Sequence, residues 1–309
     1  MFLIKEVNKM FPLNVFNSTA EIFSYANWFL IFIAVIWMIF AVIQDFRKRE
    51  VANWWNFSLI VFVLAYRAFL SVNSSNYWYF LWGVIGLIVG IVISNIFYYA
   101  RMFAGGDAKL LMALGTILPL SLSWITNLEI LFWFVVFFLL TGAIYGLVYS
   151  IILSILHFNK FKKRFREYMI EYRKLLFTFF FVFIFLILVS IFLTNSFYFS
   201  DYLLILLVIF IPLCPLLFFY AKAIEDVCMV HSVPVSMLTI GDWLVKSLKS
   251  GRKKIKPNWE GLSEEELKDI QKHVHGKVSV KYGIPFTPSF LFGFLVMLAL
   301  FYFKINLFY

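Results

Sequence analysis

The chain has 309 residues, of which 63% are hydrophobic and 21% aromatic, while only 14% carry a charge. A soluble domain usually has about 25% charged residues and cannot hide this much apolar surface. The composition therefore excludes an ordinary cytosolic protein and a disordered chain. With only two cysteines, the chain cannot be a disulfide scaffold, and no Cys or Cys/His grouping has the spacing of zinc ligands. We conclude that this is a multi-pass membrane protein.

A transmembrane helix needs roughly 20 mostly apolar residues. Apolar stretches of about this length predict eight spans, of which the fourth is short and the fifth is long. They cover residues 26–44, 54–72, 78–100, 108–122, 128–157, 175–194, 202–220 and 286–303. The predicted fold is therefore an all-α polytopic membrane protein with about eight transmembrane helices.

The positive charges lie mostly on one side of the predicted membrane topology. Loops on that side hold 23 of the 27 Lys and Arg residues. Because positively charged loops stay in the cytoplasm, this side is expected to be cytoplasmic, in a plasma-membrane protein. Residues 160–174 alternate basic and aromatic side chains and should lie on the anionic inner leaflet, so membrane lipids are expected partners. The net charge of +10 needs no nucleic acid to explain it.

Residues 222–283 form the only segment that could fold in water. Ser263-Glu264-Glu265-Glu266 predicts a capping box that opens a helix running to about His273. The alternating residues Val278–Tyr282 predict a short strand. The predicted organisation is therefore a membrane domain at 1–221, a cytoplasmic α+β segment at 222–283 and a last transmembrane helix within 284–309.

Two aspartates lie at the predicted cytoplasmic boundary. Asp45 closes the first span, and Asp107 opens the fourth, directly after Gly105 and Gly106. Two carboxylates in a partly desolvated site tend to share one proton, so that one acts as base and the other as acid. Such a pair can activate a water molecule against a peptide carbonyl. Each aspartate alone would more often be structural, but together they predict an aspartic hydrolase.

These residues also carry a family resemblance. Asp-Phe-Arg-Lys-Arg-Glu-Val-Ala-Asn (Asp45 to Asn53) resembles the first catalytic motif of the type IV prepilin peptidases, and Gly105 to Gly115 resembles the second. The resemblance covers roughly residues 26–156. It is strongest to the archaeal prepilin and preflagellin peptidases, which belong with the GxGD-type membrane aspartic proteases.

The resemblance implies specific roles for residues of this chain. The two catalytic aspartates of the family fall on Asp45 and Asp107, with Gly105, Gly106, Lys109 and Asn53 as supporting motif residues. The chain departs from the family at Ala52, where Pro is usual, and at Ala104, where the first Gly of GxGD is expected. The cysteine-rich domain of the methylating bacterial relatives is absent, so no methyltransferase activity is expected.

The implied activity is a membrane-embedded aspartic endopeptidase that uses no metal or organic cofactor. Its substrates would be pilin-like or archaellin precursors, cut between a short basic leader and an apolar helix at the cytoplasmic face. Three alternatives remain open: an intramembrane protease of other signal-peptide-like helices, a proton-coupled transporter, and a non-catalytic scaffold for pilus assembly. Nucleic acid is not an expected partner.

Several other residues have two interpretations. Lys109 could tune the aspartate pair or extend to the membrane interface, and Asn53 could cap the second span. An acidic cluster on the cytoplasmic segment could bind the basic leader, or could be a solvated helix start; it consists of Glu260, Glu264, Glu265, Glu266 and Asp269. Gly241-Asp242 repeats the Gly-Asp pair but is expected to form a turn. Glycines at 83, 86, 90, 142 and 146 predict close helix packing.

Overall fold

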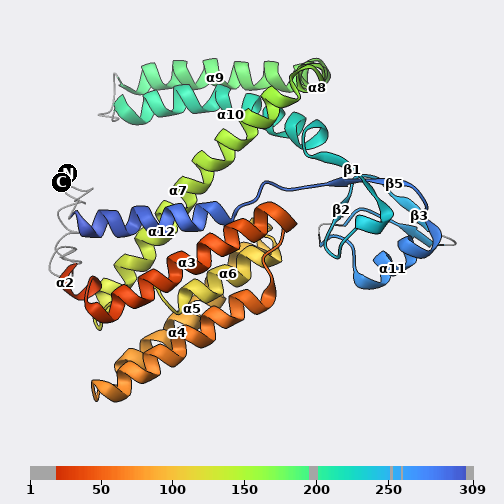
Figure 1. Ribbon diagram of the computed structural model, residues 1–309. Coiled ribbons are helices and arrows are strands. Elements are labelled where there is room, and N and C mark those ends of the chain that lie inside the picture. Colours follow the sequence, from red (N-terminus) through yellow and green to blue (C-terminus); the bar gives the residue numbers. More distant parts are fainter. Residues whose placement is uncertain (1–18, 195–200, 251–252, 259, 304–309) are drawn as a thin grey trace. The chain divides into compact units, whose positions relative to one another are not determined.

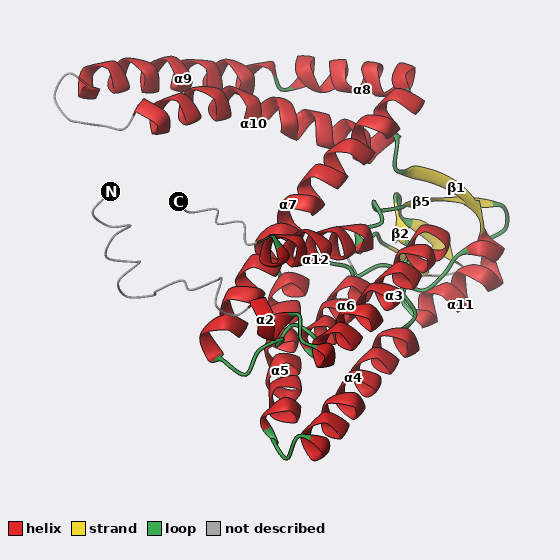
Figure 2. Cartoon of the chain, turned by 60° about the vertical axis from the view of Figure 1, so that its left-hand side comes forward, coloured by secondary structure: helices red, strands yellow, loops and turns green. Residues whose placement is uncertain are grey.

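The computed structural model describes residues 19–194, 201–250, 253–258 and 260–303 of the chain (Figure 1). Helices dominate these residues, and the strands are confined to residues 230–281 (Figure 2). Contacts divide the chain into two compact units. The first unit takes in the chain up to Gly146 and again from Ile284, and the second runs from Leu147 to Gly283. The three-part organisation expected from sequence stays a prediction, and the last helix packs with the first unit.

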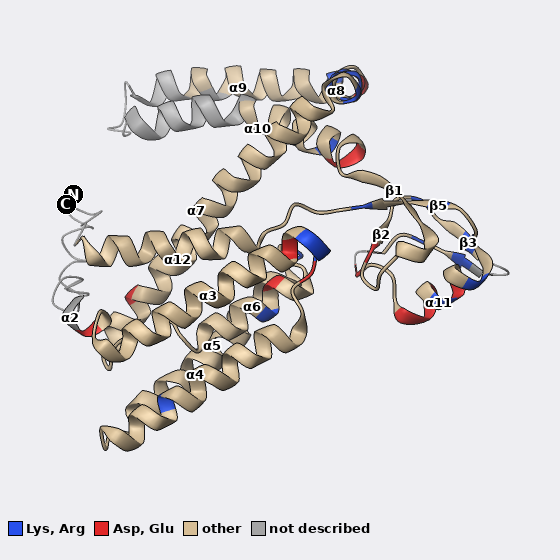
Figure 3. Cartoon of the chain, in the orientation of Figure 1, with Lys and Arg blue, Asp and Glu red and all other residues tan. Residues whose placement is uncertain are grey.

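The first unit is built from helices alone. Its elements are α2 (Thr19–Ile22), α3 (Tyr25–Lys48), α4 (Asn53–Asn73), α5 (Trp78–Tyr99), α6 (Gly105–Gly115), most of α7 (Trp124–Leu156) and α12 (Thr287–Tyr302). Charged residues are scarce along α5, α7 and α12 and gather where α3 ends and α6 begins (Figure 3). This pattern is typical of helices that cross a membrane with a polar site at one end.

Four helices, α3, α4, α5 and α7, are long and apolar enough to cross a membrane, which confirms four predicted spans and a helical membrane protein. The bent pair of α8 (Phe158–Glu171) and α9 (Arg173–Thr194) would make a fifth span if the two helices together form one. Helices α9 and α10 (Asp201–Val227) cover two further predicted spans. The side chains of part of each helix lie outside the described residues. The count of eight is therefore not supported.

The predicted span at 108–122 is wrong as a single helix. Helix α6 has only 11 residues and ends at Gly115, and the chain beyond it turns without helical structure through Pro119. Proline cannot donate a backbone hydrogen bond and disfavours helical geometry in the residue before it, so the helix cannot continue through this point. Helix α12 is also short, with 16 residues.

Glycines bring α5 and α6 into backbone contact. A Cβ atom on Gly86 would collide with the carbonyl oxygen of Gly115, and one on Gly90 would lie 3.1 Å from the Gly115 Cα. On α7, the missing side chain of Gly142 leaves room for the ring of Phe286, which precedes α12. The prediction of close packing is thus confirmed at these positions. It is wrong at Gly146, where a Cβ atom would meet no other atom within 4 Å.

The second unit combines helices with a small sheet. Strand β5 (Lys277–Lys281) lies between β1 (Val230–Pro234) and β2 (Trp243–Leu244), antiparallel to both, and β3 (Leu248–Ser250) pairs with β4 (Lys253–Ile255). Helix α11 (Glu264–His273) begins with the predicted capping box between Ser263 and Glu266. A small apolar core joins these elements; it includes Val235, Leu238, Leu244, Ile255, Leu262, Ile270, Val278 and Val280.

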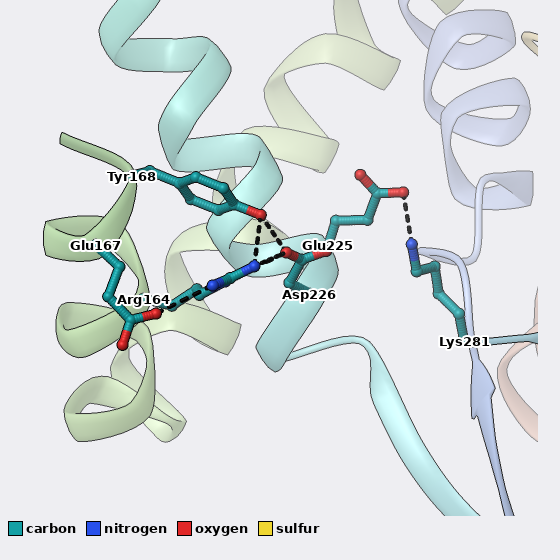
Figure 4. Close-up of polar contacts among 6 residues, drawn as sticks. All are labelled: Arg164, Glu167, Tyr168, Glu225, Asp226 and Lys281. Carbon is teal, nitrogen blue, oxygen red and sulfur yellow. Dashed lines mark hydrogen bonds and ion pairs between the residues drawn. The ribbon is translucent and has the colours of Figure 1, made fainter. Parts of the chain in front are cut away.

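A polar network ties α8 (Phe158–Glu171) and the sheet to the end of α10. Arg164 and the hydroxyl of Tyr168 both donate hydrogen bonds to the Asp226 carboxylate (Figure 4). Burial of Asp226 acts to raise its pKa, but these two hydrogen bonds, together with the charges of Arg164 and Lys281, hold the pKa below its ordinary value. From β5, Lys281 forms an ion pair of 2.7 Å with Glu225. The amphipathic helix α8 is therefore fixed to α10 by charge as well as by apolar contact.

Candidate active site

Asp45 lies in the last turn of α3 with 7% of its surface exposed. Its Oδ2 atom accepts two hydrogen bonds from Thr287 at the start of α12, one from the backbone N–H at 3.2 Å and one from Oγ1 at 2.9 Å. The helix ends directly beyond it, because Arg49 takes a left-handed conformation and its N–H bonds to the Asp45 carbonyl. The carboxylate is therefore buried, hydrogen-bonded and fixed at the end of a membrane-spanning helix.

Asp107 lies in the first turn of α6 and is partly exposed. The backbone N–H of Ala104, the residue before the helix, donates to its carboxylate. This carboxylate is also near enough to Asp45 to interact with it electrostatically. The two aspartates, about 60 residues apart in the sequence, thus lie within electrostatic range of each other.

The loop of the first motif packs against the glycine pair of the second. A Cβ atom on Gly106 would lie 3.4 Å from the backbone nitrogen of Val51, which is ordinary van der Waals contact but leaves no space for a longer side chain. The same construction at Gly105 meets no atom within 4 Å. Gly106 therefore sets the distance between the two motifs, whereas Gly105 faces open space beside the aspartates.

Both departures from the family pattern have a simple structural account. The backbone N–H of Ala52 donates to Gln44 Oε1 at 3.0 Å, a hydrogen bond that proline at this position could not make. Ala104 has φ −71° and ψ 162°, in the extended region that any L-residue adopts. Neither alanine strains the backbone next to the aspartates.

Lys109 and Asn53 bond to each other across the site. Lys109 Nζ donates to Asn53 Oδ1 at 2.6 Å and so joins α6 to the first residue of α4. The predicted capping role of Asn53 is not found, since no side-chain cap hydrogen bond is made at the start of α4. The two supporting motif residues therefore hold the second motif against the first.

Thr287 is the residue at this site that the sequence did not reveal. It is 1% exposed and stands 242 positions after Asp45, so no local pattern connects the two. The preceding residue, Phe286, packs against Phe103 and Phe138, with ring centroids 5.7 Å and 6.2 Å away. The signal available in the sequence is a Thr-Pro pair that opens the last apolar stretch, which is typical of a helix start.

The predicted acidic cluster belongs to the second unit. Glu264 forms an ion pair with Lys268 at 2.7 Å, Glu266 closes the capping box, and Asp269 lies 3.1 Å from His273. The hydrogen bond from Lys268 lowers the pKa of Glu264. Much of the cluster therefore has a structural role at the start of α11, and its binding of a leader stays a prediction.

Among the residues that the structure describes, no group of three or more His, Cys, Asp and Glu side chains could hold a metal ion. Gly241-Asp242 forms the expected turn in the second unit, where Thr239 N–H donates to Asp242 Oδ2 at 2.8 Å.

The part of the chain that contains both aspartates is similar to a known protein family. Residues 32–157 match the model of the type IV leader peptidase family, and this region contains both aspartates and their motifs. The resemblance to type IV leader peptidases is confirmed over this region. Thr287 lies outside it, so the matched family region alone does not contain every residue that contacts Asp45.

The chain is also similar to three preflagellin peptidases. The protein of Methanocaldococcus jannaschii is 31% identical over 87 residues, which are 28% of this chain and 37% of that protein. The protein of Methanococcus voltae is 26% identical over 119 residues, covering 36% of this chain and 51% of that protein. The protein of Methanococcus maripaludis is 26% identical over 87 residues, again 28% and 37%. The chain therefore matches about half or less of each relative's length, and no solved structure gives a significant match.

Proposed function

We propose that this protein is a membrane-embedded aspartic endopeptidase that removes the leader peptide from prepilin-like or preflagellin-like precursors. The observation that carries the proposal is the electrostatic interaction of Asp45, at the end of α3, with Asp107, at the start of α6. The region that holds them matches a leader peptidase family, and relatives named preflagellin peptidase share it.

The chemistry follows from the pairing of two carboxyl groups. One carboxylate takes a proton from a water molecule, which attacks the scissile carbonyl carbon, and the other carboxyl group donates a proton to the leaving amine. The two groups share one proton in the resting state because two neighbouring negative charges repel each other. The open space at Gly105 gives a peptide backbone access to the pair.

The position of the pair suits a substrate that is itself partly in the membrane. Asp45 lies near the end of a helix long enough to span a membrane, beside Arg47, Lys48 and Arg49. Positive charges at a span end favour a cytoplasmic location for it. A precursor with a short basic leader and an apolar helix would present the junction between them at this depth. The proposed location is therefore the plasma membrane, with the catalytic pair at the cytoplasmic face.

Cleavage of defined precursors tests the proposal. Detergent-purified protein is incubated with an archaellin precursor and with an adhesive pilin precursor, and the new N-terminus of each product is sequenced. We expect cleavage at the junction between leader and apolar helix. Cleavage within the apolar stretch would instead identify an intramembrane protease of another class. Failure to cut any such precursor would contradict the proposal and favour transport or scaffolding.

Leader recognition by the acidic cluster gives a separate prediction. Because Glu266 closes the capping box, the reversal is made at Glu260, Glu264 and Glu265, which are exposed. If the cluster attracts the basic leader, the triple change to Lys should raise KM severalfold and leave kcat unchanged. With a precursor whose leader lysines are replaced by Gln, the triple variant and the wild type should have the same KM. Equal KM values for both proteins with the basic leader would contradict this role.

A further inference from the structure

Thr287 gives the candidate site a component from outside the region that matches the family. Both of its donors, the backbone N–H and Oγ1, bond to the same carboxylate oxygen, Oδ2 of Asp45. Resting on the proposed function, we infer that Thr287 is a positioning residue, which orients the Asp45 carboxylate so that its other oxygen serves the attacking water. Its hydroxyl contacts a catalytic group and no reacting atom.

The start of α12 is held rigidly enough for this role. Thr287 is 1% exposed, and Pro288 follows it within the first turn, where its ring fixes the backbone. Phe286 fills the space left by Gly142 on α7, where any Cβ atom would lie 2.7 Å from the ring. Thr287 is therefore fixed by packing on both sides along the chain, as a residue that orients a catalytic group needs to be.

The second oxygen of Asp45 is the one left to act on a water molecule. Two donors on Oδ2 restrict the rotation of the carboxylate, which otherwise turns easily about its last bond. The charged groups that act on Asp45 are Arg49, beyond the end of its own helix, and Asp107 on α6. Both act through space, whereas Thr287 and the backbone N–H of Phe286 supply directional contacts. Of these donors, only the Thr287 hydroxyl belongs to a side chain. Small errors in the placement of a catalytic group have large effects on rate.

The test compares three variants in the cleavage assay. Thr287→Val keeps the shape of the side chain and removes only the hydroxyl donor, whereas Thr287→Ser keeps the donor. Thr141→Val is the matched control, because Thr141 Oγ1 bonds to the Phe137 carbonyl at 2.7 Å and to the Ser289 carbonyl at 3.0 Å. That change also removes a partly buried hydroxyl between α7 and α12 without touching Asp45.

We expect Thr287→Val to lower kcat by about 10- to 100-fold with KM unchanged, because substrate binding does not depend on the carboxylate orientation. The kcat of Thr287→Ser should stay within about threefold of the wild-type value, and the kcat of Thr141→Val should equal the wild-type value. An unchanged kcat in Thr287→Val, or an equal loss in Thr287→Ser or Thr141→Val, would overturn the inference. Thermal unfolding of each variant in detergent separates loss of fold from loss of orientation.

A chemical measurement separates this inference from the proposed function. A diazo ester esterifies accessible carboxyl groups, and mass spectrometry of the peptide that contains Asp45 gives the rate without any peptide substrate. Asp45 should react several times faster in Thr287→Val than in the wild type, because Oδ2 has lost its hydroxyl donor. Equal rates would overturn the positioning role, whereas an inactive wild type with this difference would overturn only the proposed peptidase activity.

Discussion

Replacing Asp45 or Asp107 with Asn should lower the rate of leader cleavage by about 100- to 10,000-fold. Each substitution keeps the shape of the side chain but removes the proton transfer, and the loss of one member of an acid–base pair typically costs 10²–10⁴-fold. Because the two carboxyl groups interact with each other, neither can replace the function of the other. The measurement is the rate at which the mature N-terminus appears, with purified protein and one precursor.

Asp242→Asn is the matched control for these two substitutions. It also follows a glycine, but it lies in a turn of the second unit and accepts a hydrogen bond from Thr239. This variant should cleave at the wild-type rate. If Asp45→Asn or Asp107→Asn also cleaved at that rate, the site assignment would fail while the enzyme class remained.

Replacing Arg67 with Met should unfold or strongly destabilise the first unit. Arg67 lies within the membrane-spanning helix α4, is 2% exposed and donates to four backbone carbonyls. It bonds to Thr116 at 3.0 Å, Ile117 at 3.2 Å, Pro119 at 2.5 Å and Tyr79 at 3.2 Å. Three of these carbonyls follow the end of α6, where the helix cannot satisfy them itself.

The expected loss is about 3 kcal/mol or more in the free energy of unfolding, because hydrogen bonds to charged groups contribute about 1.5–3 kcal/mol each. No water is available inside a membrane to replace them. Arg67→Lys should be intermediate, since a single ammonium group cannot reach all four carbonyls in the geometry of a guanidinium. Peptidase activity should fall with stability, because α6 carries Asp107.

The measurement is the midpoint of thermal unfolding in detergent. Arg166→Met, the same chemical change at an exposed position on α8, serves as the control and should leave the midpoint unchanged. An unfolding midpoint of Arg67→Met equal to that of the wild type would show that the hydrogen bonds of Arg67 are not needed to hold α6 in place.

Local signals in the sequence were sufficient for much of the architecture. Long apolar runs predicted α3, α4, α5 and α7, because the length of a membrane span depends on hydropathy along one segment. The capping box at Ser263 predicted the start of α11, because its hydrogen bonds join residues only three positions apart. The two aspartates could also be found, because each stands in a recognisable motif at a span end.

Contacts between distant segments decided the rest. Pro119 and the carbonyl bonds of Arg67 end α6 early, although apolar residues continue beyond it. The Lys109–Asn53 bond and the hydrogen bonds of Thr287 to Asp45 join residues 56 and 242 positions apart. Hydropathy and motif spacing describe only neighbouring residues. The sequence by itself therefore determined the membrane class and the catalytic candidates, whereas only tertiary packing decided which side chains hold them in place.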